Sequence, residues 1–149
     1  MSVKIRKGTE ADLPQILTLI KELALFEKAP EQVVNTVDLM KQDGFGKHPV
    51  YWFFVAEHNH KIIGTAIYYL RYSTWKGVRI FLEDLIVTEK SRGIGAGKLL
   101  FDACITEGKA RGYKGMNWQV LDWNTPAIDF YKTYNADLDG EWINGSIDF

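Results

Sequence analysis

The spacing of hydrophobic residues changes along this chain, and each change predicts a different secondary-structure element. Between residues 13 and 24 the apolar side chains recur at helical spacing, and Thr9 precedes them as an N-cap with acids in the first turn. Residues 51–57, 62–72 and 78–87 are instead rich in β-branched and aromatic residues, which predicts three consecutive strands. The middle of the chain is therefore expected to form three strands that follow a helix.

The second half of the chain returns to helical spacing after residue 98. Residues 116–121 then predict a strand, and Asn124 predicts the cap of a helix with Pro126 at its first position. The chain is expected to end in one or two short strands. Two further elements, a short strand and a helix, are predicted over 3–6 and 37–42. This order predicts an α/β protein with a sheet of mixed direction, in one domain over residues 1–149.

Composition limits the classes of function. The chain has 149 residues and a formal net charge of −1, which argues against a nucleic-acid partner. No apolar run is long enough to span a membrane, so we expect no membrane association. Cys104 is the single cysteine, so no disulfide forms within the chain and a cytoplasmic location is expected. The three histidines show no metal-ligand spacing with Cys104, so no metal site is predicted.

The glycine-rich segment R-G-I-G-A-G-K over residues 92–98 joins the third of these strands to a helix. Glycines at such a junction let backbone N–H groups approach a phosphate, which the start of the helix also favours. Leu99 stands where a Walker loop needs a hydroxyl, and the glycine spacing differs from a dinucleotide fingerprint. On this segment alone, a phosphate loop and a glycine-rich turn without a ligand are both open.

The pattern Arg-x-x-Gly-x-Gly, formed by Arg92, Gly95 and Gly97, resembles the acyl-CoA pyrophosphate loop of GNAT N-acetyltransferases. Within these enzymes the chain resembles the diamine/polyamine (spermidine/spermine) acetyltransferase group, and its thialysine-acetylating branch in particular. The supporting segments are 82–87 and 123–132 for the superfamily, 21–24, 43–49 and 68–69 for the group, and 26–28, 72–77 and 121–124 for the branch.

The resemblance implies a single-domain GNAT fold, with a mixed, mostly antiparallel central sheet flanked by helices. It also implies acetyl-CoA as co-substrate, no metal and a homodimer. By this resemblance the loop between the second and third strands is shorter than in the animal members, and the end at Phe149 leads us to expect that the family's last strand or tail is clipped. The residues expected at acetyl-CoA are Leu85, Ile86, Val87, Arg92, Gly93, Ile94, Gly95, Ala96, Gly97, Lys98, Asn124 and Tyr131.

Two acids, Glu83 and Asp84, close the strand that leads to the glycine loop. A primary amine is almost entirely protonated at neutral pH, so acetyl transfer needs a base to accept that proton. Successive strand residues face opposite sides, so only one of the two acids need face the cleft. We assign the base to Glu83, in line with the resemblance, although a solvated strand end or an ion pair is the alternative. A backbone N–H of Leu85 or Val87 is expected to polarise the thioester carbonyl.

Tyr131 is the candidate general acid for the departing thiolate. Its phenol is protonated at neutral pH, and the resemblance places the acid in the segment that runs from Asn124 to Tyr131. Without the resemblance, a packed aromatic beside Phe130 and Tyr134 is the alternative. Asn124 also fits a plain helix cap.

A cationic acceptor would be met by carboxylates and aromatic faces. The candidates are Phe26, Glu27, Glu83, Asn117, Trp118 and Gln119, together with Asp122 and Trp123. Each of them also fits ordinary surface or core. The sequence therefore predicts transfer of an acetyl group to a small primary amine, thialysine- or lysine-like or a polyamine, by direct attack in a ternary complex. A protein or peptide acceptor, or an acyl-CoA sensor without turnover, is the alternative.

Overall fold

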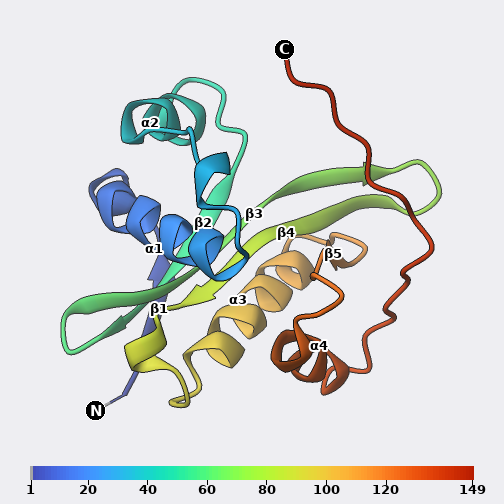
Figure 1. Cartoon of the computed structure of the whole chain (residues 1–149). Coiled ribbons are helices and arrows are strands. Elements are labelled where there is room, and N and C mark those ends of the chain that lie inside the picture. Colours follow the sequence, from blue (N-terminus) through green and yellow to red (C-terminus); the bar gives the residue numbers. More distant parts are fainter. Residues whose placement is uncertain (1) are drawn as a thin grey trace. The chain divides into compact units, whose positions relative to one another are not determined.

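Five strands form one sheet in the order β1-β2-β3-β4-β5 (Figure 1). The computed structural model describes residues 2–149. The strands are β1 Lys4–Lys7, β2 Trp52–His58, β3 Lys61–Ser73, β4 Gly77–Val87 and β5 Met116–Trp118. The first four pair antiparallel with their neighbours, and β5 pairs parallel to β4. The predicted mixed, mostly antiparallel sheet is confirmed.

Helices connect and cover these strands as the hydrophobic spacing predicted. The α-helices are α1 Leu13–Phe26, α2 Val37–Phe45, α3 Ala96–Ala110 and α4 Thr125–Lys132, and short 3-10 turns cover Glu10–Asp12, Pro30–Gln32 and Glu89–Ser91. Thr9 begins the first 3-10 turn in a capping box with Asp12, so the cap lies one turn before α1 itself. Thr36 caps α2 by accepting a hydrogen bond from the backbone N–H of Leu39 at 3.2 Å.

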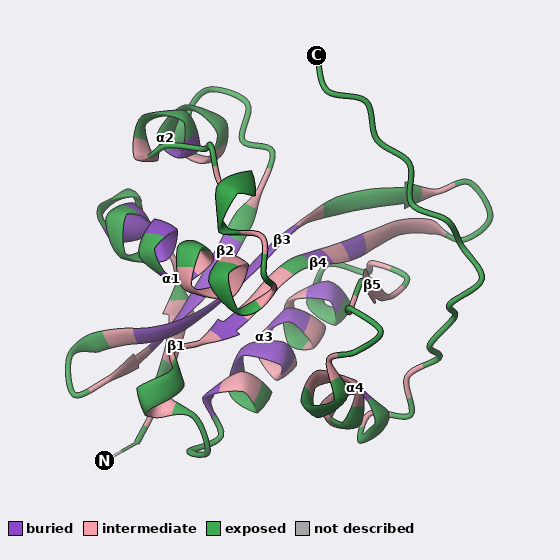
Figure 2. Ribbon diagram, viewed as in Figure 1, coloured by how far each residue is buried: buried purple, intermediate pink, exposed green. Residues whose placement is uncertain are grey.

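The sheet buries both of its faces (Figure 2). On one face Phe53, Val55 and Ile67 join the inner side chains of α1 and Met40 of α2 in a continuous core. The alternate strand residues face α3 and are also buried. A Cβ on Gly64 would lie 3.2 Å from a Leu100 methyl group, which shows how closely α3 packs on the sheet. Burial on two faces explains why the strands are nearly continuous apolar runs.

The chain divides into two compact units, of which the first ends at Trp118 and the second comprises Gln119–Phe149. The second unit contains α4, with Pro126 at its second position rather than its first. In this unit Asn124 caps α4 by accepting a hydrogen bond from Ala127 N–H at 3.4 Å. Asn135, with φ of 55°, follows the helix in the left-handed region. One domain over residues 1–149 stays a prediction.

The expected C-terminal strands are wrong for the described residues, because Gln119–Phe149 contains no strand. The strand predicted over 116–121 also ends early, at Trp118. A short apolar segment becomes a strand only when a partner strand accepts and donates its backbone hydrogen bonds. The spacing of hydrophobic residues contains no information about a partner strand, so it predicted more strand residues here than the structure has.

Candidate active site

A β-bulge in β4 brings two carboxylates to the same face of the sheet. Asp84 pairs with Ile67 and Leu82 pairs with Tyr68, so Glu83 is the extra residue between the two pairs. Because Ile67 belongs to the core under α1, Asp84 also lies on the α1 face. Bulges are common beside active sites, where they redirect side chains. The alternation of strand faces is therefore interrupted at Glu83, so the prediction that the two acids face opposite sides is wrong, and their roles at the site stay predictions.

The bulge creates a cluster of three carboxylates, Glu27, Glu83 and Asp84. Burial, and then the negative charges of Glu83 and Glu27, raise the pKa of Asp84 from 3.8 to about 7. Burial and the charge of Glu83 also raise the pKa of Glu27. Glu83 itself is exposed, while Asp84 is partly buried. An excess of negative charge at this place favours a cationic group.

Tyr69 lies beside the carboxylate cluster on β3. Burial and the Glu83 charge raise the pKa of its phenol, so Tyr69 stays neutral. Its ring stacks on Phe81 with the ring centroids 5.1 Å apart. The site therefore combines carboxylates with an aromatic wall, a combination that suits an ammonium group.

The glycine loop adopts a backbone that only glycine accommodates easily. Gly93 and Gly95 have φ of 87° and 88°, in the left-handed region, and a Cβ on either would meet nothing within 4 Å. Gly95 is the N-cap of α3, which begins without a side-chain cap. The first N–H groups of a helix have no acceptor within the helix and bind anions well. The geometry fits a diphosphate.

The C-terminal half of α1 is attached to this loop. Glu22 accepts hydrogen bonds from the Thr88 hydroxyl at 2.8 Å and from Glu89 N–H at 3.0 Å. The Arg92 guanidinium lies 5.7 Å from the ring centre of Phe26, and its Nε donates to the Val87 carbonyl at 3.0 Å. These contacts bring the predicted acceptor segment and the predicted phosphate loop together.

The last residues of β4 have an edge that β5 does not cover. Pairing between the two strands covers Ile80–Leu82 and stops at the bulge. Thr88 N–H bonds to β3 at the Ile63 carbonyl, and the direction of N–H groups alternates along a strand. The N–H groups of Leu85 and Val87 therefore point to the uncovered edge, where an extended ligand can pair with them.

Two predicted acceptor residues lie on β5 and face opposite sides of the sheet. Asn117 pairs with Phe81 and accepts a hydrogen bond from Arg79 Nε at 2.6 Å. Trp118 pairs with Leu82 and packs edge-to-face on Phe101 of α3, with ring centroids 5.3 Å apart. Trp118 thus lies on the α3 face, away from the carboxylate cluster, and the acceptor role of both residues stays a prediction.

The remaining predicted residues belong to the second unit. Gln119 donates a hydrogen bond to Asn144 at 2.8 Å. Tyr131 is 7% exposed and packs edge-to-face on Phe130, with ring centroids 5.4 Å apart. The catalytic role of Tyr131 and the acetyl-CoA contact of Asn124 stay predictions.

Two residues of the site were not selected from the sequence, namely Asp84 as a functional group and Glu22 as a support. The adjacent pair Glu83-Asp84 was visible, but the bulge that aligns their side chains depends on pairing with β3. Within residues 2–149, no group of three His, Cys, Asp or Glu side chains is placed to hold a metal ion. None of the helices over the same residues has the length and apolar character needed to span a bilayer.

Comparison with known proteins gives consistent results. Residues 16–135 match the family described as acetyltransferase (GNAT). Thialysine N-epsilon-acetyltransferase of Bos taurus is 38% identical over 142 residues, which cover 90% of this chain and 84% of that protein. Spermidine/spermine N(1)-acetyltransferase-like protein 1 of Homo sapiens is 32% identical over 93% of this chain and 21% of its own length.

A solved structure agrees in fold. An aminoglycoside acetyltransferase from an uncultured soil metagenomic sample, crystallised with trehalose, superposes with a TM-score of 0.80 at 20% identity. The match covers 99% of this chain and 96% of that one.

Proposed function

Because this chain belongs to the acetyltransferase (GNAT) family, we propose that it transfers the acetyl group of acetyl-CoA to a primary amine of a small cationic substrate. The substrate class is a thialysine- or lysine-like amino acid or a polyamine. The amine attacks directly in a ternary complex. The names of two relatives, thialysine N-epsilon-acetyltransferase and spermidine/spermine N(1)-acetyltransferase-like protein 1, support an acceptor of this kind.

The observation that carries the proposal is the carboxylate cluster at the β4 bulge. Glu27, Glu83 and Asp84 interact strongly enough that each pKa shift in the cluster includes the charge of a neighbour. Such a cluster is costly without a cation, because like charges repel in a partly buried place. An alkylammonium group offsets that cost and places its nitrogen beside a proton acceptor.

The glycine loop supports the choice of acetyl donor. The left-handed glycines Gly93 and Gly95 and the uncapped start of α3 form a cradle for a diphosphate. The uncovered N–H groups of Leu85 and Val87 fit the amides of an extended pantetheine chain. When bound, acetyl-CoA supplies an activated acetyl group as a thioester. One of these N–H groups also donates to the carbonyl oxygen as negative charge develops there.

The chain's own residues move the protons. Glu83 accepts the proton of the ammonium group, directly or through water, and the neutral nitrogen then forms a bond to the carbonyl carbon as the carbon–sulfur bond breaks. Asp84, with a pKa near neutrality, is the second candidate for this acceptor. Tyr131 donates its hydroxyl proton to the departing thiolate. As the amide forms, the nitrogen loses a second proton, which restores the Tyr131 hydroxyl. Glu83 then passes the first proton to solvent, so each turnover releases one proton.

Direct attack is supported by the position of Cys104, the single thiol of the chain. Its side chain is 0% exposed inside α3. Burial, and then the charge of Glu107, raise the pKa of this thiol to about 12. A neutral, enclosed thiol does not carry an acetyl group between donor and acceptor.

The test is thiol release from acetyl-CoA with a panel of amines: thialysine, lysine, putrescine, spermidine and a lysine-containing peptide. We expect turnover with at least one of the small amines and a higher KM for the peptide. Turnover with the peptide alone would replace the proposal with a protein acceptor. Binding of acetyl-CoA without turnover of any amine would replace it with a sensor.

Variants separate the proposed roles. Glu83→Gln and Asp84→Asn test the two candidates for the base. The variant that removes the base is expected to lower kcat about 100-fold or more and to abolish the acidic limb of the pH profile of kcat. Tyr131→Phe is expected to lower kcat by a similar factor while acetyl-CoA still binds. Tyr134→Phe is the matched control on the same segment and should retain full activity. Full activity of Tyr131→Phe would refute the acid assignment.

The homodimer and the cytoplasmic location stay predictions. Analytical ultracentrifugation of the full chain checks the first directly.

A further inference from the structure

A cavity lies in the first unit, and neither the carboxylate cluster nor the glycine loop lines it. It has a volume of about 170 Å³ and is lined from β1, α2, β2, β3 and the C-terminal end of α3. None of the residues assigned to acetyl transfer lines it. Its walls are aromatic, from Phe45, Tyr51, Trp52, Phe53, Tyr68 and Tyr113.

The end of a short strand opens this cavity. Pairing between β1 and β2 finishes at Lys7 and Phe54, and Gly8 N–H donates a last hydrogen bond to the Phe53 carbonyl at 2.8 Å. Trp52 and Phe53 point to opposite faces of the sheet, because strand residues alternate. The cavity therefore receives aromatic side chains from both faces at the edge of the sheet.

The aromatic walls are held in place before any ligand arrives. Trp52 stacks on Tyr68 with ring centroids 6.1 Å apart, and Tyr51 stacks on Phe53 at 6.2 Å. The Tyr51 hydroxyl donates a hydrogen bond to the Met40 carbonyl at 2.6 Å. A preformed wall loses little conformational entropy when a ring enters.

Two glycines in the lining allow these rings to approach the backbone. A Cβ on Gly8 would lie 1.9 Å from the Phe53 ring, and a Cβ on Gly44 would lie 2.6 Å from the Tyr51 ring. Any larger residue at either position would displace a wall. The shape of the cavity thus depends on glycine at both places.

Tyr68 supplies a polar group that the protein itself does not use. Its side chain is 5% exposed, and both flat faces of its ring are covered, by Trp52 and by Phe54. Among residues 2–149 no group forms a hydrogen bond with the Tyr68 hydroxyl. Burial is the main cause that raises the pKa of this phenol to about 12, so it is a neutral donor. Within residues 2–149 the only fully enclosed side-chain polar atom without a partner is His58 Nδ1, so the Tyr68 oxygen is open to the cavity and its hydroxyl can donate to a ligand there.

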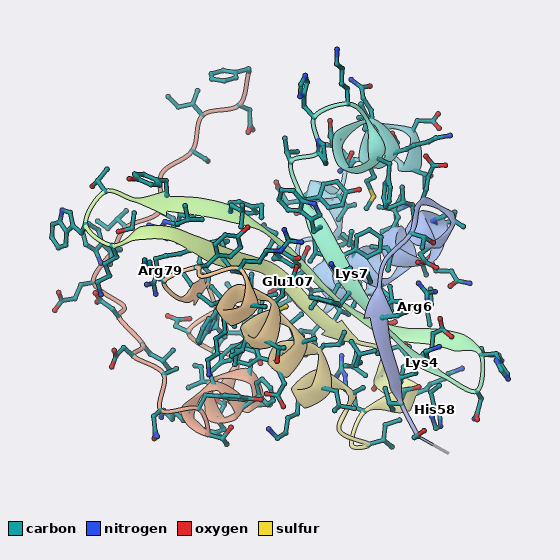
Figure 3. All side chains as sticks on the ribbon, turned by 180° about the vertical axis from the view of Figure 1, so that it is seen from behind. Lys4, Arg6, Lys7, His58, Arg79 and Glu107 are labelled. Carbon is teal, nitrogen blue, oxygen red and sulfur yellow. The ribbon has the colours of Figure 1, made fainter. Side chains whose placement is uncertain are left out.

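The charged groups of the lining carry a net charge of +1. Glu107 of α3 pairs with Lys7 of β1 at 3.6 Å (Figure 3). It also pairs with Arg111, the residue after α3, at 3.2 Å. The Glu107 side chain is only 16% exposed, whereas both cations extend into solvent. Lysine and arginine have further donors after forming one ion pair each. Glu107 therefore positions two cations at the cavity, and the excess charge favours an anion.

We propose that this cavity binds a small monocyclic aromatic carboxylate. The ring enters between the aromatic walls, and the carboxylate accepts a hydrogen bond from the Tyr68 hydroxyl and pairs with Arg111 and Lys7. The size agrees, because a cavity of about 150 Å³ holds one benzene molecule. The site is separate from the acetyl-transfer residues, so it does not depend on the proposed function.

The test uses benzoate as the probe, with benzyl alcohol and benzylamine as neutral and cationic analogues of similar size. The 15N-labelled full chain is titrated by NMR, and affinities are measured by calorimetry. We expect benzoate to shift the amide signals of Gly8 and Gly44 and to bind more tightly than either analogue. Shifts confined to residues 92–98, no shifts at about 10 mM benzoate, or tighter binding of benzylamine would overturn the proposal.

Three variants assign the contacts. Tyr68→Phe removes a hydroxyl that makes no bond within the protein, so the fold should be unchanged while benzoate binds about tenfold more weakly. Arg111→Gln should weaken binding about two- to fivefold, because this cation is partly in solvent. Lys109→Gln removes the same charge from the same helix outside this cavity and should leave the affinity unchanged. Equal affinity of Tyr68→Phe and the parent protein would exclude the assigned contact and the proposal with it.

Discussion

Replacing Asp84 with asparagine is expected to stabilise the protein above neutral pH and to change its stability little at pH 4. The Asp84 carboxyl has its pKa raised from 3.8 to about 7, mainly by burial and then by Glu83 and Glu27. In the unfolded chain this carboxyl ionises near its ordinary value. Between the two pKa values the folded state therefore holds one proton more than the unfolded state, and its stability falls as the pH rises.

The size of the effect follows from the displacement of the pKa. Each pH unit corresponds to about 1.4 kcal/mol, so a displacement of about three units corresponds to roughly 4 kcal/mol at full ionisation. Water entering the bulge on ionisation reduces this figure, and we expect Asp84→Asn to gain about 2–4 kcal/mol at pH 8. At pH 4 the carboxyl is protonated in the folded state and a little more than half ionised in the unfolded one, so the difference falls to about 0.6 kcal/mol.

Urea unfolding followed by circular dichroism at pH 4, 6 and 8 measures this difference for the variant and the parent protein. Asp129→Asn, an exposed carboxyl on α4, is the matched control and should change little between these pH values. In a Glu83→Gln background the gain from Asp84→Asn should shrink, because one repelling charge is gone. A variant that is no more stable than the parent at pH 8 would refute the assigned cost of this carboxylate.

Three further outcomes are expected. Arg6→Met leaves the buried Asp12 carboxylate without its bidentate partner and should lower the free energy of unfolding by about 3 kcal/mol at pH 7. Because the pKa of Asp12 is lowered to about 2 in the folded protein, this loss, measured by urea unfolding, should diminish as the pH falls below 3.8. Gly95→Ala, at φ of 88°, should lower the free energy of unfolding by about 1 kcal/mol and weaken acetyl-CoA binding. Gly97→Ala should leave the free energy of unfolding unchanged or raise it. Equal losses of stability in the two variants would contradict the assignment of the effect to the left-handed backbone of Gly95. Cys104, with its thiol pKa raised to about 12, should react with a thiol reagent at pH 8 only as fast as the chain unfolds, and prompt labelling would show that the site is open.

Local sequence patterns were sufficient for most of the secondary structure. The spacing of apolar residues over α1 and α3 depends on one face of each helix, which any window of the chain displays. The turn between β2 and β3 has Asn59 and His60 at φ of 52° and 62°, as a polar two-residue hairpin turn requires. The left-handed glycines of the loop before α3 are another local feature. For these elements the backbone preference and the fold agree.

Long-range pairing decided the remainder. The residue alternation along β4 put Glu83 and Asp84 on opposite sides, but the register with β3 inserts a bulge that aligns them. The strand predicted over 116–121 stopped at Trp118, and no strand formed in Gln119–Phe149, because a strand requires a partner that residue spacing does not reveal. The aromatic cavity has the same origin, since it opens where β1 ends beside β2.

The sequence by itself determined the helices and the first four strands, where the glycine loop lies and which residue types are available for acetyl transfer. These properties depend on backbone preferences and on periodicity within a few residues. The tertiary structure alone decided that Asp84 joins Glu83 and Glu27, that Glu22 attaches α1 to the loop, and that the Tyr68 hydroxyl is left without a partner. Electrostatic shifts and unpaired groups depend on the distances between residues that are remote in the chain, and only the folded arrangement sets those distances.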